Sequence, residues 1–158
     1  MRLRGRTLAT VDPVPLIMSQ LKELRGANCQ QSAVFTVLSE LYVNALDHGV
    51  LELDSKLKQG PAGFEIYFGE RARRLAALSA GQVEIALAAQ GDRLTIRIAD
   101  SGRGFDSARQ APAAGPLAPF GRGIPLVRAL CGEVVYERNG ASVEVRFPQR
   151  DTCAGTPG

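Results

Sequence analysis

Three polar residues at helical spacing are the first candidates for chemistry in this sequence. Glu40, Asn44 and His48 follow one another at i, i+4 and i+8, with Asp47 beside them, and a helix of 3.6 residues per turn places such residues along one face. A carboxylate can accept a proton, and an amide oxygen can ligate a hard cation such as Mg²⁺. An ordinary solvated helix face has the same spacing, so this stretch alone does not establish a site.

Apolar residues of the same stretch divide into two sets. Leu38, Leu41, Tyr42 and Ala45 fall on the side away from the polar face and are predicted to pack on a core. In contrast, Ala33 and Val37 project close to the polar face, which suits the wall of a pocket better than open solvent.

Two glycine-rich motifs follow, each beside a predicted element. The motif Asp100-Ser101-Gly102-Arg103-Gly104 comes directly after a strand predicted over 93–99, and Gly121-Arg122-Gly123-Ile124 opens a helix predicted over 121–130. Glycine lets the backbone approach a ligand closely, and amides at a helix N-terminus can meet phosphate oxygens. Either motif alone is weak evidence, but the polar helix and both motifs occur in order, each on a suitable element.

This combination resembles a known superfamily. A helix with Glu-x-x-x-Asn, then Asp-x-Gly-x-Gly after a strand, then Gly-x-Gly before a helix is similar to the GHKL nucleotide-binding proteins, which include gyrase and the histidine kinases. The resemblance covers roughly residues 30–148. It implies a Bergerat ATP-binding fold, an α+β two-layer sandwich whose mostly antiparallel sheet carries helices on one face. It also implies ATP and Mg²⁺ as cofactors.

The resemblance suggests roles for individual residues. Asn44 matches the asparagine that holds the metal, and Glu40 is placed to take a proton from an attacking hydroxyl or to orient a water. Asp100 matches the carboxylate that accepts a hydrogen bond from the adenine amino group, which would select ATP over GTP. With Glu40 as the catalytic residue and Asn44 as the metal ligand, the predicted cofactor-binding residues are Asn44, Asp47, His48, Asp100, Gly102, Arg103, Gly104, Gly121, Arg122, Gly123 and Ile124.

Four of these residues have competing interpretations. Arg103 and Arg122 are candidate cationic phosphate contacts, although arginines in glycine-rich loops are often only solvated. His48 either lines the phosphate end of the site or is a hydrogen-bonded helix end, which is the commoner role. Asp47 could hold His48 or a metal-bound water.

Further resemblance concerns the branch of the superfamily. Asn44-Ala45-Leu46-Asp47-His48-Gly49 looks like the Asn-Ala-x-x-His-Gly of anti-sigma factor serine kinases, which phosphorylate a serine on a STAS-domain antagonist. In many of them a sigma factor or another regulator competes for the kinase. The helical segment predicted over 61–78 resembles the kinase-like domain that ends certain response regulators with a PP2C-type phosphatase, so the chain could be part of a longer protein.

These resemblances leave three functions open. A serine kinase acting on a STAS-domain antagonist is preferred. The catalytic domain of a histidine kinase is disfavoured, because no helix with a phosphoacceptor histidine is recognised. A switch module that binds ATP and sequesters a regulator without transferring phosphate would use overlapping residues.

Composition bears on the domain organisation, the partners and the cellular compartment of the protein. The 158 residues suit one domain, predicted over 1–150 with a flexible tail over 151–158, and 45% hydrophobic with 22% charged residues is ordinary for a globular protein. The net charge of +3 is small, and its arginine clusters lack interleaved aromatic residues, so no nucleic-acid partner is predicted. No apolar run has membrane-spanning length, and three widely spaced cysteines favour a reducing cytoplasm.

Secondary structure is predicted from periodicity and turn residues. The predicted elements are a strand over 4–10, helices over 13–25, 30–48, 61–78 and 121–130, and hairpins over 82–99 and 132–148, the second turning through a type I′ Asn139-Gly140. Residues 50–60 read as a connection, and residues 101–120 as a lid that nucleotide would order.

An apolar stripe on the helix over 61–78 has two explanations. It comprises Phe64, Phe68, Arg71, Leu75 and Leu78. A helix that covers its own core is the commoner explanation, and a docking face, including one for a homodimer, is the other.

Overall fold

The computed structural model describes residues 1–21, 30–90, 93–104 and 123–147, and within them the chain forms one antiparallel sheet with helices on one face. The strand order is β1-β2-β3-β5-β4. The strands are β1 (Arg2–Arg4), β2 (Gln82–Gln90), β3 (Arg93–Asp100), β4 (Glu133–Glu137) and β5 (Ser142–Arg146). This architecture confirms the predicted α+β sandwich.

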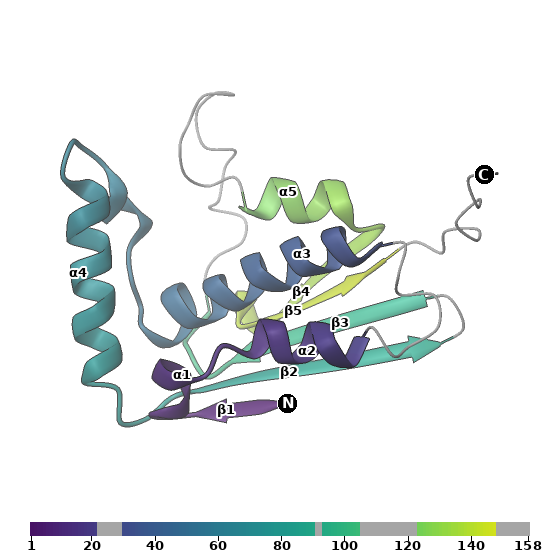
Figure 1. Cartoon of the computed structure of the whole chain (residues 1–158). Coiled ribbons are helices and arrows are strands. Elements are labelled where there is room, and N and C mark those ends of the chain that lie inside the picture. Colours follow the sequence, from purple (N-terminus) through teal and green to yellow (C-terminus); the bar gives the residue numbers. More distant parts are fainter. Residues whose placement is uncertain (22–29, 91–92, 105–122, 148–158) are drawn as a thin grey trace, which may run out of the picture.

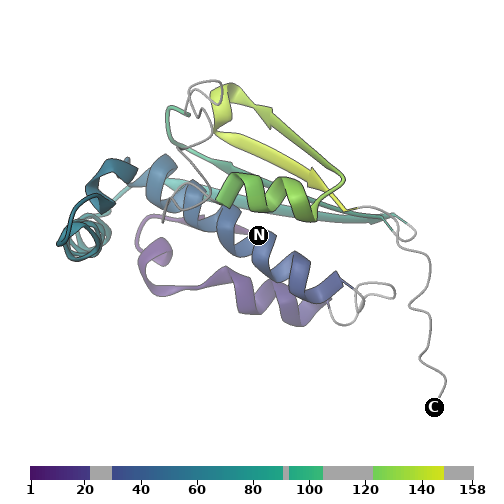
Figure 2. The same ribbon diagram turned by 90° about the horizontal axis from the view of Figure 1, so that it is seen from above.

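The helices form the second layer. They are α1 (Thr7–Thr10), α2 (Pro13–Leu21), α3 (Gln31–Val43), α4 (Gly63–Ala76) and α5 (Gly123–Leu130), with η2 (Asn44–Val50), η3 (Ser55–Lys58) and η4 (Arg138–Gly140) as shorter or irregular turns. In Figures 1 and 2, α2, α3 and α5 lie over one face of the sheet, whereas α4 stands at one end of the layer. The core lies between helices and sheet, where Val37, Leu38, Ile96 and Val145 are fully buried.

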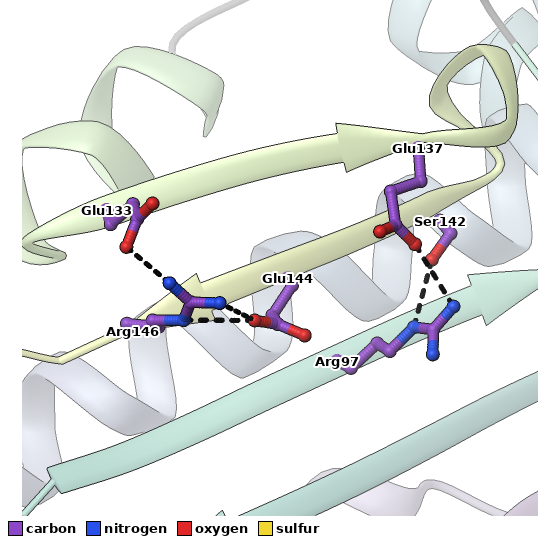
Figure 3. Close-up of polar contacts among 6 residues, drawn as sticks. All are labelled: Arg97, Glu133, Glu137, Ser142, Glu144 and Arg146. Atoms are coloured by element: carbon purple, nitrogen blue, oxygen red, sulfur yellow. Dashed lines mark hydrogen bonds and ion pairs between the residues drawn. The ribbon is translucent and has the colours of Figure 1, made fainter.

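Alternation along the strands explains why only one face of the sheet is covered. Ile96 and Ile98 of β3 point into the core, and Arg97 between them is exposed. On that outer face Arg97 pairs with Glu137 at 3.1 Å, and Arg146 pairs with Glu133 at 2.7 Å (Figure 3). These cross-strand ion pairs are solvated, so they mark a water-facing surface.

The N-terminal strand is shorter than predicted and lies earlier in the chain, so the predicted strand over 4–10 is wrong beyond Arg4. Only Arg2–Arg4 pair with β2, and Thr7–Thr10, predicted as strand, form helix α1. Gly5 has a φ of +50°, which turns the chain, and the Thr7 hydroxyl both accepts from the Arg4 amide and donates to the Arg4 carbonyl. This local hydrogen bonding ends the strand early.

The helix predicted over 30–48 changes type before it ends. α3 is regular to Val43, and the chain continues as the π-helical segment η2, in which the Leu51 amide donates to the Leu46 carbonyl at 2.8 Å. π-helical turns are rare and often lie at functional sites. In this protein the π-helical segment contains Asn44, Asp47 and His48.

Only part of the stripe predicted over 61–78 faces the core, where Leu75 and Leu78 pack partly buried. Phe64 and Phe68 are 49% and 59% exposed, whereas Tyr67 is 1% exposed. The explanation that the whole stripe covers the core is therefore wrong for both phenylalanines. Tyr67 is buried instead of the two phenylalanines because its hydroxyl donates a hydrogen bond to a buried carboxylate, which is described below.

Both hairpins are confirmed, but the second turn differs from its prediction. Its loop lies between the paired residues Glu137 and Ser142, and the left-handed residues are Arg138 (φ 51°), Asn139 (φ 53°) and Gly140 (φ 84°). The prediction of a two-residue turn at Asn139-Gly140 is wrong because the reversal uses four residues. The predicted lid and the predicted tail fall largely or wholly outside the described residues.

Candidate functional site

One cavity is lined by residues from several elements, among them η2 and the start of α5. It holds about 440 Å³ of space including its open mouth, of which about 30 Å³ is accessible to the centre of a water molecule. Its lining residues are Leu41, Asn44, Ala45, His48, Gly49, Ile98, Asp100, Gly104, Ile124, Tyr136, Gly140 and Val143. The polar helix and both glycine motifs, far apart in sequence, therefore contribute to one cavity.

Asp100 is the buried carboxylate of this cavity. It is 7% exposed at the end of β3, and the Gly102 amide donates to its Oδ1 at 2.8 Å. Burial raises the pKa of Asp100, and the Gly102 amide and the charge of Arg138 oppose that rise. Within the described parts of the chain Oδ2 receives no hydrogen bond, so it is placed to accept one from a ligand.

Gly49 makes room for this carboxylate. A Cβ at Gly49 would lie 2.6 Å from Asp100 Oδ2, too close for any real side chain. Gly49 lies within η2, next to the last residue of that segment. Because glycine has no side chain, η2 can pass directly over Asp100. A methyl group at position 49 would occupy the space that the Asp100 carboxylate now fills.

Gly49→Ala is expected to destabilise the protein by about 1–3 kcal/mol, because the new methyl group must displace Asp100 or η2. Chemical denaturation would measure the loss. A matched control is Gly69→Ala on α4, where a Cβ meets nothing within 4 Å and alanine should instead stabilise the helix by about 0.5–1 kcal/mol. Equal stability of Gly49→Ala and the wild type would show that the close approach does not exist.

Glu40 and Asn44 meet the start of α5. A Cβ on Gly123 would touch the Glu40 carboxylate and lie 3.9 Å from Asn44 Nδ2. Gly123 therefore allows the N-terminus of α5 to lie against the polar side of α3 and η2. Ile124, the next residue, lines the cavity. The structure brings these four predicted residues together.

His48 lines the cavity and is also held by the backbone. Its Nδ1 lies 2.7 Å from the Leu53 carbonyl oxygen. Because a carbonyl only accepts, Nδ1 carries the proton in this contact, and a neutral ring would leave Nε2 as an acceptor. His48 is therefore a hydrogen-bonded helix end, as one interpretation held, and it also lies in the cavity wall, while its place at the phosphate end stays a prediction.

Asp47 is placed differently from the other motif residues. It is 2% exposed and does not line the cavity. The Tyr67 hydroxyl donates to Oδ2 at 2.9 Å, and Arg71 Nε donates to Oδ1 at 2.8 Å. Because both oxygens are used by α4, the idea that Asp47 holds His48 is wrong: the partner of His48 is Leu53.

The arginines and the remaining glycines complete the predicted set. The Arg103 side chain is 95% exposed and 3.9 Å from Glu52, so the structure does not bring it to the cavity. Gly102 contacts Asp100, and Gly104, with a φ of +80°, lines the cavity. Gly121 and Arg122 lie outside the described residues.

Sequence reasoning missed part of the apolar wall. Leu41 and Ala45, assigned to the core, line the cavity, whereas Val37 is fully buried and is not part of its wall. Leu41 and Ala45 are also buried in the core as predicted, so periodicity assigns them correctly but cannot show that this part of the core borders a cavity. Tyr136 and Gly140 were also missed, and their strand and turn carried no ligand-binding pattern.

Within the parts of the chain that the structure describes, no acidic or histidine-rich metal cluster accompanies this cavity. In the described ranges, no group of three or more His, Cys, Asp or Glu side chains is arranged to hold a metal. The oxygen of Asn44 suits a Mg²⁺ whose remaining ligands are phosphate and water oxygens, because such a metal needs few protein ligands. The described helices also include none long and apolar enough to cross a membrane.

Comparison with known proteins identifies a family. A family model described as a histidine kinase-like ATPase domain matches residues 7–147. A search of curated proteins found no match. The matched region contains the polar helix, both glycine motifs and every residue of the cavity.

Proposed function

Because the chain belongs to the family of histidine kinase-like ATPase domains, we propose that it binds ATP in this cavity and phosphorylates a serine of a STAS-domain anti-sigma factor antagonist. The observation that carries the proposal is the convergence of Asn44, Asp100, Gly104 and Ile124 on one cavity, with Glu40 beside Gly123. Partner switching in a bacterial cytoplasm, with a sigma factor or another regulator as competitor, is the setting that the motif Asn44–Gly49 favours.

Asp100 would recognise the adenine base. Its Oδ1 is occupied by the Gly102 amide, so Oδ2 would accept from the adenine amino group. Guanine presents a carbonyl oxygen at that position, and two acceptors would face each other. The apolar wall of Leu41, Ile98 and Val143 would enclose the base.

Asn44, Glu40 and the start of α5 would bind the phosphates and transfer the proton. Asn44 would hold Mg²⁺, which when bound neutralises phosphate charge. The Glu40 carboxylate would take the proton of the serine hydroxyl. At the same time the serine oxygen would attack the γ-phosphorus, and the bond between that phosphorus and the β,γ-bridging oxygen would break. The α5 N-terminus, at Gly123, supplies amides and a favourable dipole for phosphate oxygens.

Transfer to a partner is tested with labelled ATP. The protein, Mg²⁺, ATP and candidate STAS domains are mixed, and the modified residue is mapped by mass spectrometry. We expect phosphate on a serine of the STAS domain and only slow ATP hydrolysis without it, because no partner hydroxyl then meets Glu40. Acid-labile phosphohistidine, on His48 or on a partner, would contradict the serine-kinase proposal, and tight ATP binding without any transfer would favour the switch module.

A further inference from the structure

The side of η2 away from the cavity is held by α4. Asp47, buried in η2, receives the Tyr67 hydroxyl and Arg71 Nε. One turn further along α4, Arg74 Nη1 donates to the carbonyls of Leu51 at 2.6 Å and Glu52 at 2.9 Å. The name α4 clamp is used below for these contacts of Tyr67, Arg71 and Arg74. They hold both Asp47 and the chain that leaves η2.

The clamped backbone has a conformation that it would not adopt by itself. η2 is π-helical, and Glu52 has a φ of +52°, in the left-handed region. Such conformations persist only where surrounding contacts impose them. The contacts at this place include the hydrogen bonds of Arg74 to the Leu51 and Glu52 carbonyls and the two hydrogen bonds to Asp47.

The same short segment presents the cavity residues. Asn44, His48 and Gly49 belong to η2 and line the cavity, whereas α4 contributes no residue to its wall. His48 is additionally tied to Leu53, whose own amide donates to the Asp47 carbonyl at 2.8 Å. A change at Asp47 therefore reaches the cavity through the backbone of residues 47–53.

We propose that Tyr67, Arg71 and Asp47 are positioning residues for the nucleotide site, with α4 holding η2 in the conformation that presents Asn44, His48 and Gly49 to the ligand. This inference rests on the proposed function for the identity of the ligand, while the hold on η2 can be tested without it. Loss of the clamp lets η2 relax toward a regular helix. By reciprocity, a nucleotide bound in the cavity stabilises α4.

Two buried phenols near Asp47 offer a matched test. Tyr67→Phe removes the hydroxyl that binds Asp47 and keeps the ring. Tyr42→Phe removes a hydroxyl that is also buried but finds no hydrogen-bond partner among the described residues, so it is the control. The Tyr67 variant should bind Mg·ATP roughly 2- to 30-fold more weakly, the range for residues that act on a site without touching its ligand. The control should bind like the wild type.

Hydrogen exchange separates positioning from general stability. In the nucleotide-free Tyr67→Phe protein, amides of 44–53 should exchange faster than in the wild type, while those of 93–100 in β3 should not change. In the wild type, Mg·ATP should slow exchange in 63–76. Unchanged exchange at 44–53, or acceleration spread equally over β3, would overturn the proposal.

Nucleotide binding and the hold on η2 can be lost independently of each other. If the wild type binds no nucleotide but exchange at 44–53 responds as expected, the proposed function is wrong and the hold on η2 stands. If Tyr67→Phe exchanges faster at 44–53 yet binds Mg·ATP with wild-type affinity, the hold exists but does not position the site, and the inference is wrong.

Discussion

Glu40→Gln is expected to lower the rate of phosphate transfer by about 10²–10⁴-fold, the usual contribution of a general base. Glutamine keeps the length and shape of the side chain beside Gly123 but cannot take the proton of the incoming hydroxyl. Affinity for Mg·ATP should be retained, because Glu40 is not part of the cavity wall. Transfer from labelled ATP to the STAS partner and calorimetric titration measure the two quantities separately.

Two further variants make the test of Glu40 specific. Glu65→Gln, at an exposed position on α4, should transfer phosphate at the wild-type rate. Asn44→Ala should instead lose Mg²⁺-dependent binding, because it removes the proposed metal ligand. A wild-type transfer rate in Glu40→Gln would exclude the general-base role and leave Glu40 at most an orienting one.

Asp100→Asn should weaken ATP binding about 5- to 150-fold, the loss expected when a buried hydrogen-bonding group meets a mismatched partner. The Gly102 amide, which donates to Oδ1, fixes the orientation of the substituted side chain. Its oxygen must stay toward Gly102, so its NH2 group points at the adenine amino group, and two donors face each other. Calorimetry of the variant against the wild type measures the change.

Stability provides the control for this variant. Burial raises the pKa of Asp100, which means that the folded state disfavours the charged carboxylate relative to the unfolded chain. At neutral pH its ionisation therefore lowers stability, and the neutral amide should unfold at the same or a higher temperature than the wild type. Weak binding together with a lowered unfolding temperature would instead indicate damage to the fold.

The convergence of the motifs was predictable because it depends on local patterns. A strand that ends at Asp100, a glycine motif after it and Gly123 at a helix start are visible in the sequence. The fold brings the end of β3, the glycine motif after it and the start of α5 to one cavity. Asn44, Asp100, Gly104 and Ile124 accordingly line the same cavity.

The features that were missed depend on tertiary contacts. Periodicity assigns Asp47 to the neighbourhood of His48, but its partners Tyr67 and Arg71 come from a helix that begins after the chain has left η2 and η3. The same contact explains the error on α4. Hydrophobicity alone ranks Phe64 and Phe68 above Tyr67 for burial, whereas a buried carboxylate needs a donor, and only Tyr67 supplies a hydroxyl.

Nucleotide selectivity of the wild-type protein tests the central claim most directly. Calorimetric titration with ATP and with GTP, each with Mg²⁺, compares two ligands that differ in the base and share the triphosphate. The structure predicts saturable binding of ATP and little binding of GTP, because Asp100 Oδ2 can accept from the adenine amino group and cannot pair with the guanine carbonyl. Equal affinity for the two nucleotides, or no binding of ATP, would contradict the assignment of this cavity.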